Sequence, residues 1–332
     1  MTAPGARRPA RLAAVAVDAP HCALGESPRW AYGAWWWVDA DAGVLWGADA
    51  GLTTAGGARE VREVLRTGGR LSLAHPAGGG RLVVASGTDL LVVDPGGGPP
   101  RPWSRIDLPP GWLVNDGTAD AAGRLWIGSV HPDRARGAGS LHVVATDGRV
   151  RTVATGFTLS NGMAWRSPTL MVHADSGERC LWEHEVEPGT GRLLRSRRGN
   201  RLPDAAAAGT ASPGTVAAPP GGDAGSAAAG LALPDGVAVD RAGGLWVAMY
   251  GTGQVWRLVG DQVTAVVEVP TPQVTSVALG GPDGRDMLIT TAREGMDAAA
   301  VAADPHAGRL FRARVRVPGS VLFHMRILAA DF

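Results

Sequence analysis

Four oxygen-bearing side chains stand at nearly the same distance before similar apolar runs of the chain. They are Glu26, Asn115, Asn161 and Asp235. Two carboxylates and two amide oxygens make an all-oxygen set, which a hard divalent cation such as Ca²⁺ or Mg²⁺ prefers, with Mn²⁺ as a further candidate. No His or Cys occupies an equivalent position, so the set does not suit a conventional structural zinc site. If the fold brings these residues together, they predict a metal site.

A simpler interpretation is that these residues only form turns. Asn161-Gly162 and Asp235-Gly236 are strong turn signals, because Asn, Asp and Gly tolerate the positive φ of tight turns. Glu26, within "GESPRW", argues against this interpretation, since no turn calls for a glutamate there. We therefore expect Asn161 to contribute a neutral metal ligand, while Gly162 supplies the backbone freedom of a turn.

The elements that must position these residues form an internal repeat. Six strand-like runs are similar: "AWWWVDA", "GRLVVAS", "GRLWIGS", "PTLMVHA", "GGLWVAM" and "RDMLITT". Anchor residues taken from them lie 46, 43, 45, 75 and 42 positions apart, at Trp36, Leu82, Leu125, Leu170, Leu245 and Met287. The long gap contains an Ala/Gly/Pro-rich stretch, 204–230, which we expect to be a flexible insertion. Six β-rich units of this length predict an all-β fold, the six-bladed β-propeller.

The repeat places the polar residues at the starts of the innermost strands. Glu26, Asn115 and Asp235 lie 10 positions before their anchors, and Asn161 lies 9 before its own. Innermost propeller strands surround a common axis, so their starts should converge at one mouth of the channel. The two other units offer Ser72 and Val277 at this offset, with Thr275 and Ser276 beside Val277.

Other features of the repeat concern packing and closure. We interpret Trp37, Trp126 and Trp246, which recur at equivalent strand positions, as contacts between blades. The N-terminal stretch "RPARLAAVAVDA" is expected to join the last blade as its outer strand and to close the ring. The whole chain, 1–332, is predicted to be one domain, and the pattern does not place the tail at 318–332.

Composition excludes several classes of function. The net charge is +1, which gives no reason to expect nucleic acid or an anionic membrane surface as a partner. All 32 basic residues counted as Lys or Arg are arginines, so Schiff-base and P-loop lysines are excluded. No apolar run reaches the ~18 residues of a membrane span. We expect a cytoplasmic protein, monomeric or weakly oligomeric.

Several motifs, in order along the chain, resemble those of the gluconolactonase / senescence-marker-protein / luciferin-regenerating-enzyme family. They are "LGESPRW", "VNDGTADAAGRLWIGS", "LSNGMAW", "LPDGVAVDRAGGLWVAMYGTGQVWRL", "VTSVALGGPDGRDMLITTAR" and "HAGRLF". The resemblance implies a six-bladed propeller that hydrolyses lactones with a divalent metal. It covers the chain apart from the insertion and the tail after about Val317.

Carried over position by position, the resemblance assigns roles to individual residues. Glu26, Asn161 and Asp235 match metal ligands, and Asp235 also matches the family's candidate general base. Asn115 matches a residue that contacts water or substrate, and Asp116 lies beside it. The resemblance favours Ca²⁺ as the cofactor, with Zn²⁺, Mg²⁺ or Mn²⁺ as alternatives.

Two positions depart from the family. Leu113 stands where members commonly have an arginine that holds sugar hydroxyls, and a leucine cannot make those forked hydrogen bonds. Asp133 replaces a glutamate of animal members, and we expect either Asp133 or a metal-bound hydroxide to share the role of general base. Gluconolactone is therefore a less suitable substrate than a less polar lactone or another ester.

The sequence thus favours metal-assisted hydrolysis of a small-molecule lactone. In this hypothesis the cation polarises the carbonyl, Asp235 deprotonates the attacking water, and Asn115 orients it. The alternative is a non-catalytic metal-binding propeller that acts as an interaction platform. A third reading, a strictosidine-synthase-like reaction, ranks lowest because those propellers lack the full Glu/Asn/Asp set.

Overall fold

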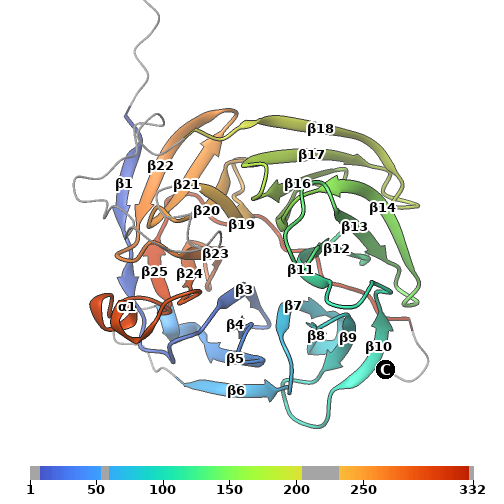
Figure 1. The fold of residues 1–332 in the computed structure, drawn as a ribbon, viewed down its shortest axis with the longest axis horizontal. Helices are drawn as coiled ribbons and strands as arrows, with labels where there is room; N and C mark the ends of the chain where they lie inside the picture. The colour runs from blue at the N-terminus through green and yellow to red at the C-terminus, as the bar shows by residue number, and fades with distance from the viewer. Residues whose placement is uncertain (1–7, 54–59, 204–231, 329–332) are drawn as a thin grey trace, which may run out of the picture.

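The computed structural model describes residues 8–53, 60–203 and 232–328. They form six sheets arranged as a ring around a common axis (Figure 1). In each sheet the strands follow one another from the axis outward, and neighbouring strands are antiparallel except for the outermost pair of the fifth blade, so each sheet is one blade of a propeller. The six-bladed β-propeller predicted from the repeat is confirmed, while the predicted insertion at 204–230 lies outside the described residues.

The blades follow one another in chain order. The first blade comprises β3 (Gly25–Ala31), β4 (Ala34–Asp39), β5 (Val44–Asp49) and β6 (Val61–Arg66). The second comprises β7 (Leu71–Ala77), β8 (Arg81–Ser86), β9 (Asp89–Val93) and β10 (Arg101–Arg105). The third comprises β11 (Leu113–Ala119), β12 (Leu125–Val130), β13 (Gly139–Val144) and β14 (Val150–Phe157). The fourth blade comprises β15 (Ser160–Ser167), β16 (Leu170–Asp175), β17 (Cys180–Val186) and β18 (Leu193–Arg201). The fifth includes β19 (Leu233–Val239), β20 (Leu245–Tyr250), β21 (Gln254–Val259) and β22 (Gln262–Glu268). The sixth includes β23 (Val274–Gly280), β24 (Asp286–Thr291) and β25 (Phe311–Arg314).

Helices are few and short. The described residues include two 3₁₀ turns, η1 (Ala50–Thr53) and η2 (Gly78–Gly80), and the helix α1 (Ala298–Ala303). None of the helices among these residues has the length and apolar character needed to cross a membrane. The sheets therefore provide the whole framework that positions the site.

The N-terminal segment closes the ring, although it does so differently from the prediction. β1 (Ala10–Ala13) pairs in parallel with β22 in the fifth blade, and β2 (Val15–Ala16) pairs with β25 in the sixth. The segment thus bridges two blades instead of joining only the last one. Leu12 packs against the apolar core between these blades, which explains why the segment spans both.

The tryptophans pack between blades, as predicted. Trp37 and Trp126 are fully buried and Trp246 is 2% exposed. The indole Nε1 of Trp126 donates to Asp120 at 2.9 Å, and that of Trp246 donates to Asp240 at 3.1 Å. The same aspartates accept backbone amides of the turn before the tryptophan strand, so each one ties a turn to the blade interface.

Every inner strand carries a β-bulge near its start. The pairing with the second strand of the blade shifts between Glu26 and Arg29, Leu71 and Leu73, Val114 and Gly117, Ser160 and Met163, Pro234 and Val237, and Val274 and Ser276. A bulge releases one or two residues from the ladder and redirects their side chains. The residues released here include Asn115, Asn161 and Asp235, whereas Glu26 pairs with Val38 directly before the bulge of its strand.

Gly162 has a different role from the predicted one. It lies within β15 and does not adopt a positive φ, so it does not form a turn. A Cβ at this position would lie 2.5 Å from the carbonyl oxygen of Asp235 and 2.7 Å from the Cα of Gly236 in the neighbouring inner strand. The glycine is needed because two inner strands approach each other closely, and the expectation of turn freedom was wrong.

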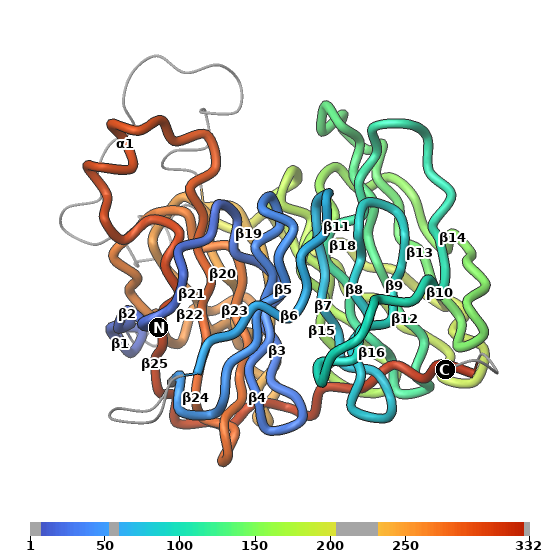
Figure 2. Tube along the Cα trace, turned by 90° about the horizontal axis from the view of Figure 1, so that it is seen from below, coloured from blue at the N-terminus to red at the C-terminus, as the bar shows by residue number. Residues whose placement is uncertain are grey.

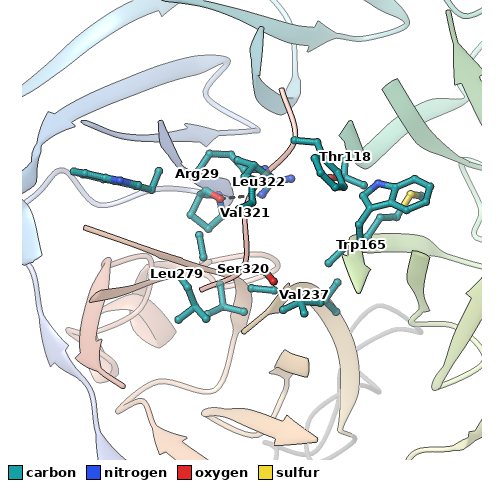
Figure 3. Close-up of a pocket in the computed structure, with 17 residues that line it drawn as sticks. Arg29, Thr118, Trp165, Val237, Leu279, Ser320, Val321 and Leu322 are labelled. Carbon is teal, nitrogen blue, oxygen red and sulfur yellow. Dashed lines mark hydrogen bonds between the residues drawn. The ribbon is translucent and has the colours of Figure 1, made fainter. Parts of the chain in front are cut away.

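The C-terminal segment crosses the end of the channel at which the inner strands finish (Figure 2). Its backbone pairs first with Asp240 and then with Ala77 through the bridges to Gly319 and Met325. A small cavity remains between this segment and the inner strands. Figure 3 shows Arg29, Thr118, Trp165, Val237 and Leu279 around it, with Ser320, Val321 and Leu322 of the crossing segment. This segment covers the channel end opposite to the starts of the inner strands.

Replacing Gly162 by alanine tests the close approach of the inner strands. We expect Gly162→Ala to destabilise the fold by about 1–3 kcal/mol, because the added methyl group overpacks two backbones. Urea unfolding measures the difference. Gly189→Ala is the matched control, since Gly189 has open space around its Cβ position and no positive φ. Equal stability of the two variants would contradict the close-approach interpretation.

Candidate active site

The starts of the inner strands enclose a cleft of about 310 Å³. Glu26 from β3, Asn115 from β11, Asn161 from β15 and Asp235 from β19 all line it. The structure therefore brings together the four residues that the repeat aligned. Thr275 of β23 lines the cleft as well, whereas the lining includes neither Ser72 nor Val277.

Hydrogen bonds fix the two amide side chains by their nitrogen atoms. Asn161 Nδ2 donates to Ser176 Oγ at 3.1 Å, and Ser176 Oγ donates to the carbonyl of Pro234 at 2.6 Å. Asn115 Nδ2 donates to the carbonyl of Ser160 at 3.0 Å. With the nitrogens engaged, the amide oxygens remain available as ligands. Ser176 was not identified from the sequence, because it follows the second strand of its blade instead of opening the first.

Two buried aspartates hold the inner strands in register just before the site. Asp39 accepts the backbone amides of Ala23 and Leu24, at 2.9 and 3.1 Å. Asp175 accepts the amides of Thr158 and Leu159 in the same manner, each at 3.0 Å. Each aspartate ends the second strand of its blade and thereby fixes the chain two residues before Glu26 or Asn161. These supports were also missed by the sequence analysis, since an aspartate at a strand end resembles an ordinary turn residue.

The two carboxylates of the cleft destabilise each other. Burial, followed by the charge of Asp116, raises the pKa of Glu26 to about 8, while Arg70 opposes the shift. Burial and then the charge of Glu26 raise the pKa of Asp235 well above its ordinary value. Oδ1 of Asp235 is buried and has no hydrogen-bond partner among the described residues. Two crowded carboxylates with an unsatisfied oxygen call for a bound cation or a shared proton.

The residues fit a divalent cation. Glu26, Asn161 and Asp235 present two carboxylates and one oriented amide oxygen to the same cleft, a donor set suited to hard cations. Within the described parts of the chain, no three His, Cys, Asp or Glu side chains gather as a metal site. The fit therefore depends on the amide oxygens, and the unpartnered Oδ1 of Asp235 is the observation that supports it.

The rim of the cleft carries charged groups that were not predicted. Arg134 Nη2 donates to Glu294 Oε1 at 2.9 Å, and the Tyr250 hydroxyl donates to Glu294 Oε2 at 3.3 Å. Burial and the charge of Glu294 raise the pKa of Tyr250. Arg70 lines the cleft from the start of the second blade. Loops outside the repeat carry Arg134 and Glu294, so no strand offset could have identified them.

Asp116 and Asp133 are not among the residues that line the cleft. Asp116 is buried and accepts Arg29 Nη2 at 2.9 Å, so this ion pair lies behind the cleft lining. The Asp133 side chain is 89% exposed, while its neighbours His131, Pro132 and Arg134 line the cleft. The structure thus does not bring Asp133 to the carboxylate pair, because the loop after β12 directs its side chain into solvent.

Leu113 does line the cleft, and it belongs to an apolar collar. Four leucines, each two positions before one of the polar residues, share this place: Leu24, Leu113, Leu159 and Leu233. We call Glu26, Asn115, Asn161 and Asp235 the polar floor of the cleft. The collar surrounds this floor with groups that cannot form hydrogen bonds. It therefore offers an apolar surface to whatever enters the cleft.

Comparison with known proteins identifies the family. The family model described as "SMP-30/Gluconolactonase/LRE-like region" matches residues 24–293, which include every polar residue of the cleft floor. The chain belongs to this family. Among the solved structures, the gluconolactonase-like chain resembles the calcium-binding protein regucalcin from Agrobacterium tumefaciens, with a TM-score of 0.78 and 25% identity over 97% of this chain and 100% of that one.

Curated relatives of this gluconolactonase-like chain include enzymes named for lactones. The 6-deoxy-6-sulfogluconolactonase of Pseudomonas putida is 34% identical over 212 residues, which are 62% of each protein. The pentonolactonase of Haloferax volcanii is 33% identical over 211 residues, which are 62% of this chain and 63% of the relative. The matched region thus spans less than two thirds of the length of these two relatives.

The raised pKa of Glu26 predicts how the stability of the cation-free protein depends on pH. The folded state keeps a proton on Glu26 up to about pH 8, whereas an unfolded chain releases it near the ordinary pKa of 4.5. The unfolded state is therefore favoured progressively as the pH rises through this window. We expect the thermal unfolding midpoint in EDTA to fall more steeply between about pH 5 and about pH 8 for the wild type than for Glu26→Gln. Parallel pH profiles for the two proteins would contradict this assignment.

Proposed function

We propose that the chain is a metal-dependent lactonase, a hydrolase that opens a cyclic ester by attack of water. The observation that supports this best is the unpartnered Oδ1 of Asp235, which lies in one cleft with Glu26 and with two amide side chains held by their nitrogens. Two relatives named as lactonases support the substrate class.

Each residue has a role that follows from its position. Glu26, Asn161 and Asp235 would hold the cation, and we favour Ca²⁺ because a solved relative is named a calcium-binding protein. When bound, the cation would polarise the lactone carbonyl and offset the charge that develops on its oxygen. The carboxylate of Asp235 would accept the proton of the attacking water, and the Asn115 amide would orient that water or the ring oxygen.

The collar sets the polarity of the substrate. The leucines around the floor, including Leu113, provide no partner for a row of sugar hydroxyls. A hydroxyl buried against them would lose its hydrogen bonds to water without replacement. We therefore propose a small lactone with at least one apolar face as the substrate, in a protein that acts in the cytoplasm without nucleic acid or membrane as partner.

Hydrolysis of a lactone panel tests the function. We expect turnover that EDTA abolishes and that one of Ca²⁺, Mg²⁺, Mn²⁺ or Zn²⁺ restores. Asp235→Asn should lower kcat by a factor on the order of 10²–10⁴, the usual contribution of a positioned general base. Asp147→Asn is the control for loss of one carboxylate, because Asp147 lies in an outer turn paired with Arg149.

The same experiment decides between the enzyme and the interaction platform. Calorimetric titration of the cation measures binding separately from turnover. A tightly bound cation, weakened in Glu26→Gln, with no hydrolysis of any lactone or ester, would overturn the proposal and favour the platform.

A further inference from the structure

The four leucines of the collar occupy a position that recurs in all six blades, and we use the name collar from here on for all six residues. One of the six is charged. Each inner strand has one residue at or beside its bulge that we use as a reference: Glu26, Ser72, Asn115, Asn161, Asp235 and Thr275. The residues two positions before them are, in chain order, Leu24, Arg70, Leu113, Leu159, Leu233 and Gln273. Four of them are leucines that line the cleft, and Gln273 donates to the carbonyl of Glu294 at 2.8 Å. Arg70 also lines the cleft, so the collar places one guanidinium group beside an otherwise apolar wall.

The hydrogen bonds of Arg70 leave part of this guanidinium without a partner. Nη1 forms an ion pair with Asp41, which fixes one side of the group. Nε is buried and has no hydrogen-bond partner among the described residues. A buried N–H donor that lacks an acceptor is costly, and native structures rarely tolerate one without a ligand or water.

The second arginine of the cleft, Arg134, is more exposed to solvent than Arg70. Arg134 donates to Glu294 at 2.9 Å, and its side chain is 56% exposed, compared with 31% for Arg70. Each arginine pairs with one carboxylate, but solvent screens the charge of Arg134 more strongly than that of Arg70. Arg70 is the better-placed group for a ligand that enters between the leucines.

We propose that Arg70 determines specificity by binding an oxyanion substituent of the substrate, so that the enzyme acts on lactones with an apolar face and one anionic group. This inference rests on the proposed lactonase function and specifies the class of lactone that the enzyme would hydrolyse. The planar fork of a guanidinium matches the paired oxygens of a carboxylate, sulfonate or phosphate. The leucines at the other collar positions accommodate the ring but not a set of hydroxyls.

A matched pair of substrates tests the inference. The γ-lactone of hydroxyglutaric acid keeps a free carboxylate, and the corresponding γ-lactone carboxamide has nearly the same shape without the charge. We expect the wild type to prefer the carboxylate, and Arg70→Gln to lose about ten- to a hundredfold in kcat/KM for it. Activity on the carboxamide should change by no more than about threefold, because that lactone has no oxyanion for Arg70 to bind.

Three further variants separate binding of the oxyanion from indirect effects. Asp41→Asn removes the ion pair but keeps the guanidinium, and it should keep the preference for the carboxylate. Arg70→Lys keeps the charge without the fork and should lose part of the preference. Arg149→Gln removes an arginine that is 86% exposed on an outer turn, and it should behave as wild type. A preference for the carboxylate that persists in Arg70→Gln would overturn the role of Arg70.

Binding of the hydrolysis product distinguishes this inference from the proposed function. Calorimetry with hydroxyglutarate measures recognition of the oxyanion without turnover. If the wild type hydrolyses both lactones equally well, the inference is wrong and the lactonase function stands. If neither lactone is hydrolysed but hydroxyglutarate binds in an Arg70-dependent manner, the lactonase function is wrong and the recognition stands. Arg70-independent binding would overturn the inference in either case.

Discussion

The close approach of six inner strands to one axis is the constraint on which the site depends. At the cleft their backbones leave no room for some Cβ atoms, as the distance of 2.6 Å from a Cβ on Gly236 to the Cα of Ser276 illustrates. A regular ladder could not aim side chains into so narrow a space, and each inner strand bulges there instead. In the first blade, Ser27 adopts a φ of 51°, and its Oγ accepts the amide of Ala74 at 3.1 Å. The bulges thus help to bring groups from five of the six inner strands into one cleft, namely Glu26, Asn115, Asn161, Asp235 and Thr275.

Crowding the ring also creates its chemistry. Glu26 and Asp235 come from the first and fifth blades, whose inner strands both pack against β23 of the sixth blade, while β1 and β2 tie the fifth and sixth blades together. Burial and the charge of Glu26 raise the pKa of Asp235, and burial and the charge of Asp116 raise that of Glu26, so a cluster of ionised carboxylates is electrostatically unfavourable here. Binding a cation would relieve this repulsion, and the folding free energy therefore supplies part of the affinity. A scaffold held together by strand pairing tolerates such a cost because its core lies between the blades, away from the axis.

The sequence predicted the parts of this arrangement that follow the repeat. Strand offsets identified Glu26, Asn115, Asn161 and Asp235, because inner strands of a propeller must converge whatever their sequence. Turn propensity failed for Gly162, since an extended glycine and a turn glycine have the same signature in one sequence. The family resemblance, and not the offset, gave Asp133 a role, but its side chain faces solvent on a loop whose course is set by local contacts. Ser176, Asp175 and Glu294 lie outside the offset, and only the folded chain shows what they contact.

The collar shows how a repeat fold separates reactivity from recognition. The polar floor requires specific residues in particular blades, because its oxygens must act on one point. Two positions earlier, five of the six blades place a residue in the cleft lining, and none of these residues belongs to the polar floor. The family's arginine at the position of Leu113 and the Arg70 of this chain occupy such equivalent places in neighbouring blades. An arginine in the second blade instead of the third would bind a charged substituent at a different angle around the axis. The ligand would then be rotated about the axis, while the residues of the floor stay in place. Substrate range in this architecture can therefore change by substitutions at collar positions, without any alteration of the strands that hold the carboxylates.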